Sequence, residues 1–153
     1  MQTRFVVDTA QAQNVKNTAL NLYEQVAERW KINDPICKDW LRWAAYLHEV
    51  GLAIAHSAYH KHSGYLVQYC DMPGFSKQNQ ETLAILLKGH RKKLPIQDVE
   101  TMSKRAAKTH MRLCILLRLA VLLHFGRGID EVVDPKIKAF KFSIKLAFPE
   151  GYL

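Results

Sequence analysis

The side chains best suited to chemistry are gathered in one stretch, from Leu47 to Gly64. It holds four of the seven histidines: His48, His56, His60 and His62. His48 is followed directly by Glu49 at the end of an apolar helical pattern, and His60 comes twelve residues after His48. Imidazole and carboxylate groups carried by separate helices can converge on one divalent cation. The first chemistry to test is therefore metal-dependent.

A second group of ionisable residues follows Gly89 and is basic throughout, from His90 to Lys93. Together with the first group it predicts contacts to a polyanion. The predicted binding residues are His56, His60, Lys61, His62, His90, Arg91, Lys92, Lys93, Arg118, His124 and Arg127. Two other interpretations stay open. His48, Arg118 and His124 lie in apolar helical patterns, where such side chains are often simply hydrogen-bonded. The run Arg91–Lys93 is also compatible with a solvated surface.

The overall charge agrees with a polyanion partner. The chain of 153 residues carries a formal net charge of +8, and 48% of its residues are hydrophobic. A basic balance of this size favours partners such as polyphosphate, nucleotides, nucleic acid or acidic lipid, although it also occurs in merely soluble proteins. The length and hydrophobic content are enough for one domain with a core of its own.

Cysteine usage and hydropathy indicate a cytoplasmic protein with no membrane partner. Cys37, Cys70 and Cys114 show no paired spacing, which argues against a disulfide framework or a zinc ribbon and favours a reducing compartment. The segment before Asp8 is too short and polar for a signal peptide. The longest apolar run, from Leu113 to Phe125, is interrupted by a basic residue and is typical of a buried helix.

The elements that must position these residues are helical, and we expect an all-α bundle of about six helices. Helical spacing and capping residues predict helices over 9–30, 34–48, 57–69, 76–89 and 99–125. Asp34-Pro35 is a strong helix start, and Ser57 and Ser76 are predicted N-caps. Pro95 should stop the helix before it from continuing.

In the C-terminal tail the spacing of apolar residues changes from the helical period to a period of two. Apolar residues alternate with others from Phe140 to Phe148, which predicts one C-terminal β-strand. Because a single strand is not stable alone, this one needs a partner from the chain or from another copy. We therefore expect a helical domain over residues 1–130 and a strand segment over 131–153, the latter as the start of a further region.

The pair His48-Glu49, with His60 and Gly64 behind it, resembles the core of the HD phosphohydrolase superfamily. That resemblance implies an HD-like helical bundle, in which a working site also has a metal-binding histidine in the first helix and an aspartate in the last long helix. The corresponding positions here are Gln11 and Val121, and the aspartate of the pair is replaced by Glu49. We therefore predict a degenerate site without a bound metal.

Longer blocks resemble the C-terminal region of exopolyphosphatases and guanosine pentaphosphate phosphohydrolases, the Ppx/GppA family. They are in the family order and span about 4–127; the blocks are 41–51, 54–66, 72–76, 89–92 and 116–124. The resemblance implies a helical domain that follows two actin-like domains, lines a basic channel for polyphosphate and helps to form a homodimer.

The same resemblance implies that catalysis lies elsewhere. The catalytic glutamate and glycine-rich phosphate loops of the family belong to the actin-like domains, and no such loop motif occurs in this sequence. We therefore expect a non-catalytic polyphosphate-binding and dimerisation domain that has no cofactor of its own, with Mg²⁺ acting in the full-length enzyme.

Two other functions stay open. One is a metal-dependent HD phosphohydrolase with a reduced site, acting on a nucleotide or phosphate ester. The other is a basic helical module that binds nucleic acid, although the sequence shows no helix-turn-helix pattern and no interleaving of aromatic and basic residues.

Overall fold

In a computed structural model of the chain, which describes residues 9–125, 135–141 and 143–149, the central element is the long helix α6. The elements run in the order α1 (Thr9–Val26), α2 (Pro35–Leu47), the 3₁₀ turn η1 (Val50–Ala53), α3 (Tyr59–Tyr69), α4 (Lys77–Gly89), α5 (Ile96–Val99), α6 (Lys104–His124), β1 (Lys136–Ala139) and β2 (Ile144–Ala147). The expected all-α bundle of about six helices is confirmed.

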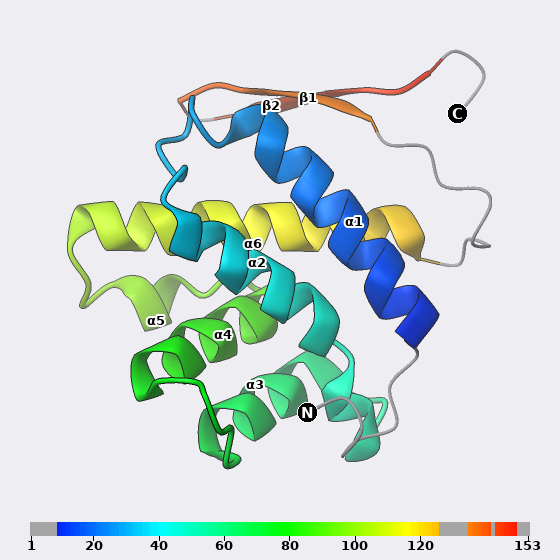
Figure 1. Ribbon diagram of the computed structural model, residues 1–153, viewed down its shortest axis with the longest axis vertical. Helices are drawn as coiled ribbons and strands as arrows, with labels where there is room; N and C mark the ends of the chain where they lie inside the picture. The colour runs from blue at the N-terminus through cyan, green and yellow to red at the C-terminus, as the bar shows by residue number, and fades with distance from the viewer. Residues whose placement is uncertain (1–8, 126–134, 142, 150–153) are drawn as a thin grey trace.

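Helix α6 is packed on several sides. Figure 1 shows α1 and α2 crossing one side of it, with α4 and then α3 below, and α5 near its N-terminal end. The fully buried residues of α6 form the middle of the core; they are Leu113, Cys114, Leu116, Leu117 and Ala120. Helices α3 and α4 make the closest helix pair, so they form a unit that rests on α6 through α4.

Three of the helices begin at side-chain caps. The Asp34 carboxylate accepts a hydrogen bond from the Ile36 N–H, and Ser76 and Ser103 accept from the N–H three residues later. The caps predicted at Asp34 and Ser76 are thus confirmed. The last long helix, predicted from residue 99, begins only at Lys104 after the Ser103 cap, and Val99 is instead the last residue of the separate short helix α5.

The start of α3 differs from the prediction. Its first residue is Tyr59, and the residue before it is Ala58, which has a left-handed backbone (φ 54°) and makes no side-chain cap. Ser57 is therefore not the N-cap. The left-handed residue Ala58 lies between Ser57 and the first residue of α3. The Ser57 side chain therefore does not occupy the N-cap position, from which it could accept from the free N–H groups of the first turn.

The tail also differs from the prediction. Instead of one strand from Phe140 onward, β1 and β2 form an antiparallel hairpin in which Ile137 pairs with Leu146 and Ala139 with Ile144. The Phe140 N–H donates to the Ser143 carbonyl at the turn. The alternating pattern runs on through this turn, so hydropathy alone does not separate the strand from the connection. The partner that a lone strand would need comes from the chain itself.

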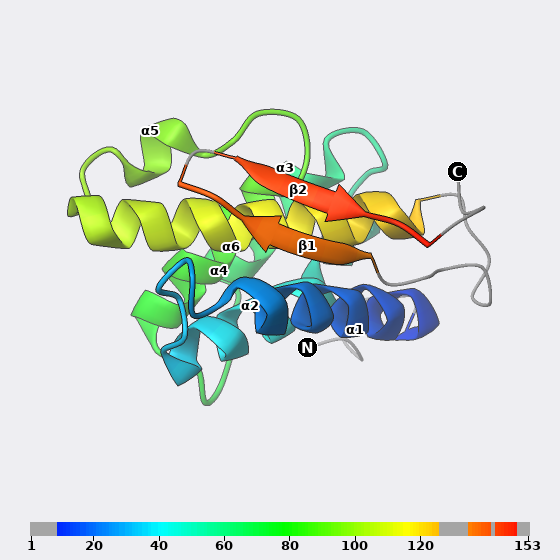
Figure 2. The same cartoon turned by 90° about the horizontal axis from the view of Figure 1, so that it is seen from above.

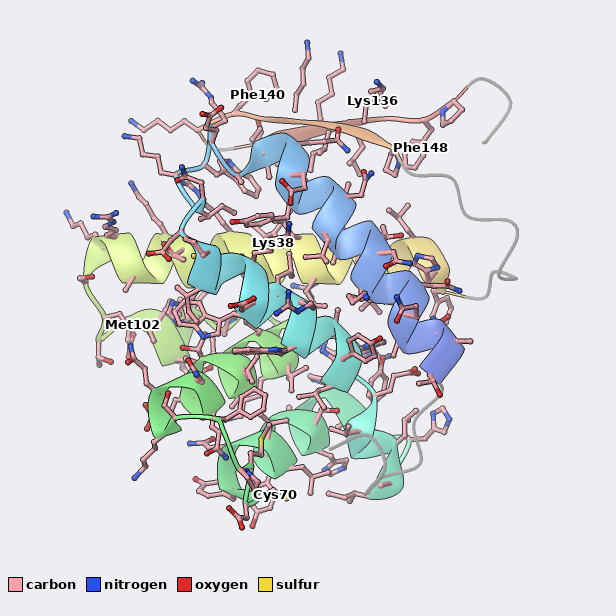
Figure 3. All side chains as sticks on the ribbon, viewed as in Figure 1. Lys38, Cys70, Met102, Lys136, Phe140 and Phe148 are labelled. Atoms are coloured by element: carbon pink, nitrogen blue, oxygen red, sulfur yellow. The ribbon has the colours of Figure 1, made fainter. Side chains whose placement is uncertain are left out.

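The hairpin packs on α1 through β1, and Figure 2 shows its two strands side by side above the helices. Gln25 holds it, since its side chain accepts from the Ile137 N–H and donates to the Pro135 carbonyl. The Ile137 side chain is buried in the core. In Figure 3, Lys136 and Phe140 on the hairpin lie at the opposite end of the molecule from Cys70, which follows α3.

Candidate functional site

Three buried histidines meet where the ends of α2 and α4 face the start of α3. His48 follows the last residue of α2, His90 follows the last residue of α4, and His60 lies in the first turn of α3. The rings of His48 and His90 are edge to face with centroids 5.6 Å apart, and the centroids of His60 and His90 are 6.3 Å apart. We call these three residues the histidine cluster.

His48 and His90 are held in the same way. The Nδ1 of His48 lies 2.6 Å from the Ala45 carbonyl, and the Nδ1 of His90 lies 2.5 Å from the Leu87 carbonyl. Because a carbonyl only accepts, Nδ1 carries the proton in both rings and Nε2 keeps its lone pair. Each helix end thus fixes the tautomer of the histidine that follows it.

A serine clamp ties α3 to the end of α2. The Ser63 hydroxyl donates to the His48 carbonyl and accepts from the Gly51 N–H, both at 2.8 Å. A Cβ at Gly51 would lie 2.1 Å from the Tyr59 carbonyl oxygen and 2.4 Å from the Ser63 nitrogen. Only glycine therefore allows α3 to approach this closely, which explains the glycine three residues after His48.

Burial keeps the histidine cluster neutral. It lowers the pKa of His48 to about 4, and burial together with the neighbouring His48 lowers that of His90 to about 3. The pKa of His60 is lowered by burial and then by the cations around it, Arg91 first. The 3.9 Å contact between His48 Nε2 and Glu49 Oε1 is accordingly no ion pair at neutral pH.

Neither the histidine cluster nor the two other positions at which the resemblance implied ligands fit a hard divalent cation. Gln11 is half-buried in the first turn of α1, and Val121 is buried in α6 without a donor atom. Within 9–125, 135–141 and 143–149, no group of three histidines, cysteines or carboxylates is arranged to hold a metal ion. Magnesium prefers several oxygen ligands, whereas this cluster offers imidazole nitrogens and one nearby carboxylate.

A groove opens beside the cluster, with a volume of about 1380 Å³, and His60 belongs to both. Three helices and the segment after α4 contribute its basic lining: His60, Lys61, His62, Lys88, Lys92, Lys93 and Arg118. Asp98 is the one carboxylate among the described lining residues. We call this the basic groove. The two basic segments seen in the sequence therefore share one surface, and α6 adds Arg118 to it.

The segment after α4 is shaped by contacts of its own. Lys92 has a left-handed backbone (φ 59°), and its carbonyl accepts a hydrogen bond from the Arg118 guanidinium. Arg91 turns away from the groove lining and lies over the ring of Tyr59, 4.7 Å from its centre. The three consecutive basic residues thus divide: Lys92 and Lys93 line the groove, and Arg91 packs behind it.

The other predicted residues lie apart from the groove. His56 is exposed between η1 and α3, outside the lining. His124 is buried at the end of α6, where its Nε2 lies 2.7 Å from the Thr18 hydroxyl of α1. His90 belongs to the histidine cluster. Arg127 lies outside the described residues.

Several lining residues of the groove were not predicted from the sequence. Lys88 lies in the last turn of α4, two residues before the basic run His90–Lys93, so its position in the sequence was a usable signal. Tyr65, Leu94, Pro95 and Ile96 supply an apolar part of the lining. Tyr65 is 59% exposed and Ile96 is 64% exposed, which hydropathy gave no reason to expect.

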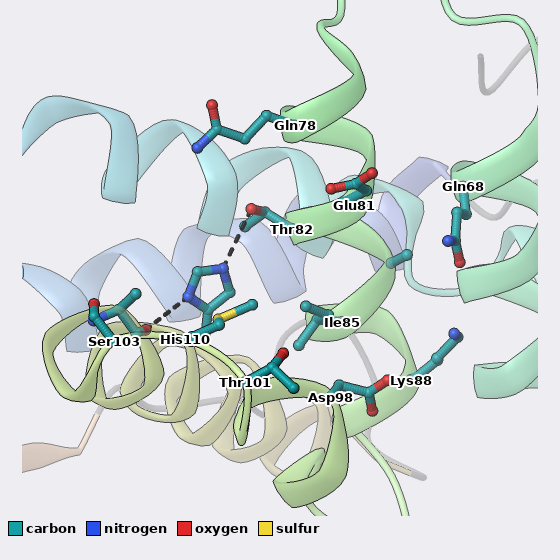
Figure 4. Close-up of a pocket in the computed structure, with 13 residues that line it drawn as sticks. Gln68, Gln78, Glu81, Thr82, Ile85, Lys88, Asp98, Thr101, Ser103 and His110 are labelled. Atoms are coloured by element: carbon teal, nitrogen blue, oxygen red, sulfur yellow. Dashed lines mark hydrogen bonds between the residues drawn. The ribbon is translucent and has the colours of Figure 1, made fainter.

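A second pocket of about 560 Å³ lies between α3, α4 and the start of α6 (Figure 4). His110 in its wall has both ring nitrogens occupied: Nδ1 donates to the Ala106 carbonyl, and Nε2 lies 3.2 Å from the Thr82 hydroxyl. A histidine bound on both sides links α4 to α6, so we assign it a structural role.

None of the helices in the described part is both long enough and apolar enough to cross a membrane. The family model described as Ppx/GppA phosphatase, domain III, matches residues 1–153.

Proposed function

We propose that this chain, which belongs to the Ppx/GppA phosphatase domain III family, is the non-catalytic polyphosphate-binding domain of an exopolyphosphatase-like phosphohydrolase. The observation that carries the proposal is the convergence of Lys61, Lys93 and Arg118 on the basic groove, from three parts of the sequence. In the full-length enzyme the actin-like domains would carry the catalytic residues and Mg²⁺, and two copies would pair as a homodimer in the cytoplasm.

The charge of the groove supports this ligand class. Polyphosphate carries about one negative charge per phosphate along its whole length, as nucleic acid does, so its affinity is the sum of many contacts. Each exposed contact is weak by itself and is screened by salt. Six basic side chains besides His60, with Asp98 as the one described carboxylate, provide that kind of extended positive lining.

The buried histidine cluster supports the non-catalytic part of the proposal. We interpret it as a degenerate HD-like centre, and the neutral imidazoles that meet between α2, α3 and α4 support that interpretation. Val121 has no atom that can bind a metal, and Gln11 is a weak ligand. The alternative function, a metal-dependent phosphohydrolase, is not supported by a comparable observation among the described residues.

The test is polyphosphate binding over a series of salt concentrations. The variant Lys92→Gln with Lys93→Gln removes two groove cations, and it should reduce the slope of log affinity against log salt by about one to two. The matched control is Lys104→Gln with Lys108→Gln, which removes two exposed lysines of α6 outside the groove lining. The control should keep the parent slope. Equal slopes for all three proteins would exclude the basic groove as the binding surface.

A further inference from the structure

The apolar part of the basic groove is not explained by inorganic polyphosphate. Every atom on the surface of that polymer is hydrophilic, so it gains nothing from contact with Tyr65, Leu94, Pro95 or Ile96. Two of these four side chains are more than half exposed. Large apolar side chains left in water within a groove usually mark a ligand or partner surface.

The aromatic component lies on the exposed face of α3. Tyr65 and Tyr69 are one helical turn apart, their ring centroids are 4.9 Å apart, and they are 59% and 67% exposed. Lys61 is one turn before Tyr65 on the same face. Basic and aromatic residues therefore do interleave here, but at a spacing of four residues, which a linear reading of the sequence does not reveal.

We propose that the basic groove binds single-stranded nucleic acid, with a base stacked on Tyr65 and the neighbouring phosphates held by the lysines of the lining. Surfaces that bind single strands without sequence preference combine these two features, a positively charged groove that follows the backbone and aromatic rings on which bases stack. This inference rests on the proposed function in one respect: both proposals assign phosphate binding to the same basic side chains of the groove.

The size of the groove and the position of the ring favour a single strand. At about 1380 Å³ the groove is larger than most small-molecule pockets, which suits a polymer segment. A duplex hides the faces of its bases, so only an unpaired base can lie flat on Tyr65. Duplex DNA or RNA should therefore bind through its phosphate charges alone, without the additional affinity from a stacked base.

The experiment compares three probes by fluorescence anisotropy and competition at one salt concentration. They are a single-stranded oligonucleotide of about ten nucleotides, an abasic oligomer with the same number of phosphates, and inorganic polyphosphate of matched charge. The proteins are the parent, Tyr65→Ala, Tyr65→Phe, and Phe125→Ala as the matched control. Phe125 is 79% exposed at the end of α6 and lies outside the groove lining.

We expect the oligonucleotide to bind the parent about tenfold more tightly than the abasic oligomer, because a base stacked on an aromatic side chain strengthens binding by about that order. Tyr65→Ala should abolish this difference, Tyr65→Phe should keep it, and Phe125→Ala should leave it unchanged. Polyphosphate affinity should be the same in all four proteins. Unchanged thermal midpoints would show that the variants are folded.

Two results would overturn the inference. It fails if the abasic oligomer binds the parent as tightly as the oligonucleotide does, or if Tyr65→Ala weakens the binding of polyphosphate as much as that of the oligonucleotide. These outcomes are separate from the test of the proposed function. If the parent does not bind polyphosphate but binds the oligonucleotide through Tyr65, the proposed function falls and this inference stands.

Discussion

His48 and His90 lie edge to face with ring centroids 5.6 Å apart, and each donates its Nδ1 proton to a carbonyl three residues earlier. The ends of α2 and α4 therefore carry the same local arrangement, a histidine bonded back to the last turn of its own helix, although the two histidines are 42 positions apart (90 − 48). Both imidazoles are buried and neutral, which makes the junction of α2, α3 and α4 sensitive to acid.

The first prediction concerns pH. The pKa values of His48 and His90 in the folded protein are about 4 and about 3, below the ordinary 6.5. Between pH 6.5 and pH 4 the unfolded chain therefore binds more protons than the folded one, so the free energy of unfolding should rise with pH in this window and fall on acidification. Urea unfolding measured at several pH values checks this.

The contribution of the cluster can be separated from that of exposed histidines. His90→Gln should reduce the slope below pH 6.5, and His56→Gln, which removes an exposed imidazole outside the cluster, is the matched control. A free energy of unfolding that stays flat from pH 6.5 to pH 4 in the parent would contradict neutral burial of these rings.

The second prediction concerns Gly51. In Gly51→Ala the new Cβ would meet the Tyr59 carbonyl oxygen at 2.1 Å, so α3 must move and the Ser63 clamp must loosen. We expect a loss of about 3 kcal/mol in the free energy of unfolding, as for other overpacked sites. The control is Gly74→Ala, where nothing lies within 4 Å and only the left-handed backbone (φ 88°) is strained.

The control should cost about 1 kcal/mol, the usual penalty of a side chain in that conformation. Denaturant unfolding of both variants makes the comparison. Equal losses at the two glycines would show that the close approach of α3 to Gly51 is not important for stability.

The third prediction concerns Arg118. Its guanidinium donates to the Lys92 carbonyl, so Arg118→Gln should remove one groove charge and also release the turn that carries Lys92 and Lys93. Polyphosphate affinity should fall by about tenfold at low salt, from the lost phosphate contact and the looser turn together. Amide hydrogen exchange in the segment after α4 should become faster.

The matched control for this prediction lies on the same helix. Arg112 also donates to a backbone carbonyl, that of Trp30, and its guanidinium lies over the Trp30 ring. Arg112→Gln should therefore lower the stability but leave polyphosphate affinity as it is. If both arginine variants weaken binding alike, Arg118 acts through general stability or net charge and not through the groove.

The fourth prediction is that the chain does not hydrolyse phosphoanhydrides. Val121 and Gln11 stand at two of the positions where the HD resemblance implies metal ligands, so phosphate release from polyphosphate or guanosine pentaphosphate should stay at background with magnesium or manganese. A phosphate-release assay is sufficient. Turnover that scales with the amount of chain and survives repurification would contradict the proposal of a non-catalytic domain.

Local features of the fold were predictable from the sequence, because they depend on neighbouring residues. Asp34 and Ser76 cap helices, since their short polar side chains reach the free N–H groups two or three residues on. The start of α3 was not predictable in this way. It depends on the left-handed Ala58 and on the clamp between Gly51 and Ser63, which are twelve residues apart.

The hairpin shows a second limit. Alternating hydropathy predicted an extended tail correctly, but the turn after Phe140 carries the same alternation as the strands. What divides the tail is its contact with α1, where Gln25 binds Pro135 and Ile137. A pattern of period two reports which side of a strand is apolar, and it does not report where the chain reverses.

The sequence by itself determined the helical class, the main helix starts, the excess of basic residues and the family resemblance, because these depend on composition and on residues close together in the chain. The tertiary structure alone decided which basic residues share a surface. It joined Lys61, Lys93 and Arg118 in one groove with Tyr65, turned Arg91 onto Tyr59, and buried His90 and His124. The reason is physical: the direction of each side chain depends on how α3, α4 and α6 pack, and that packing joins residues tens of positions apart.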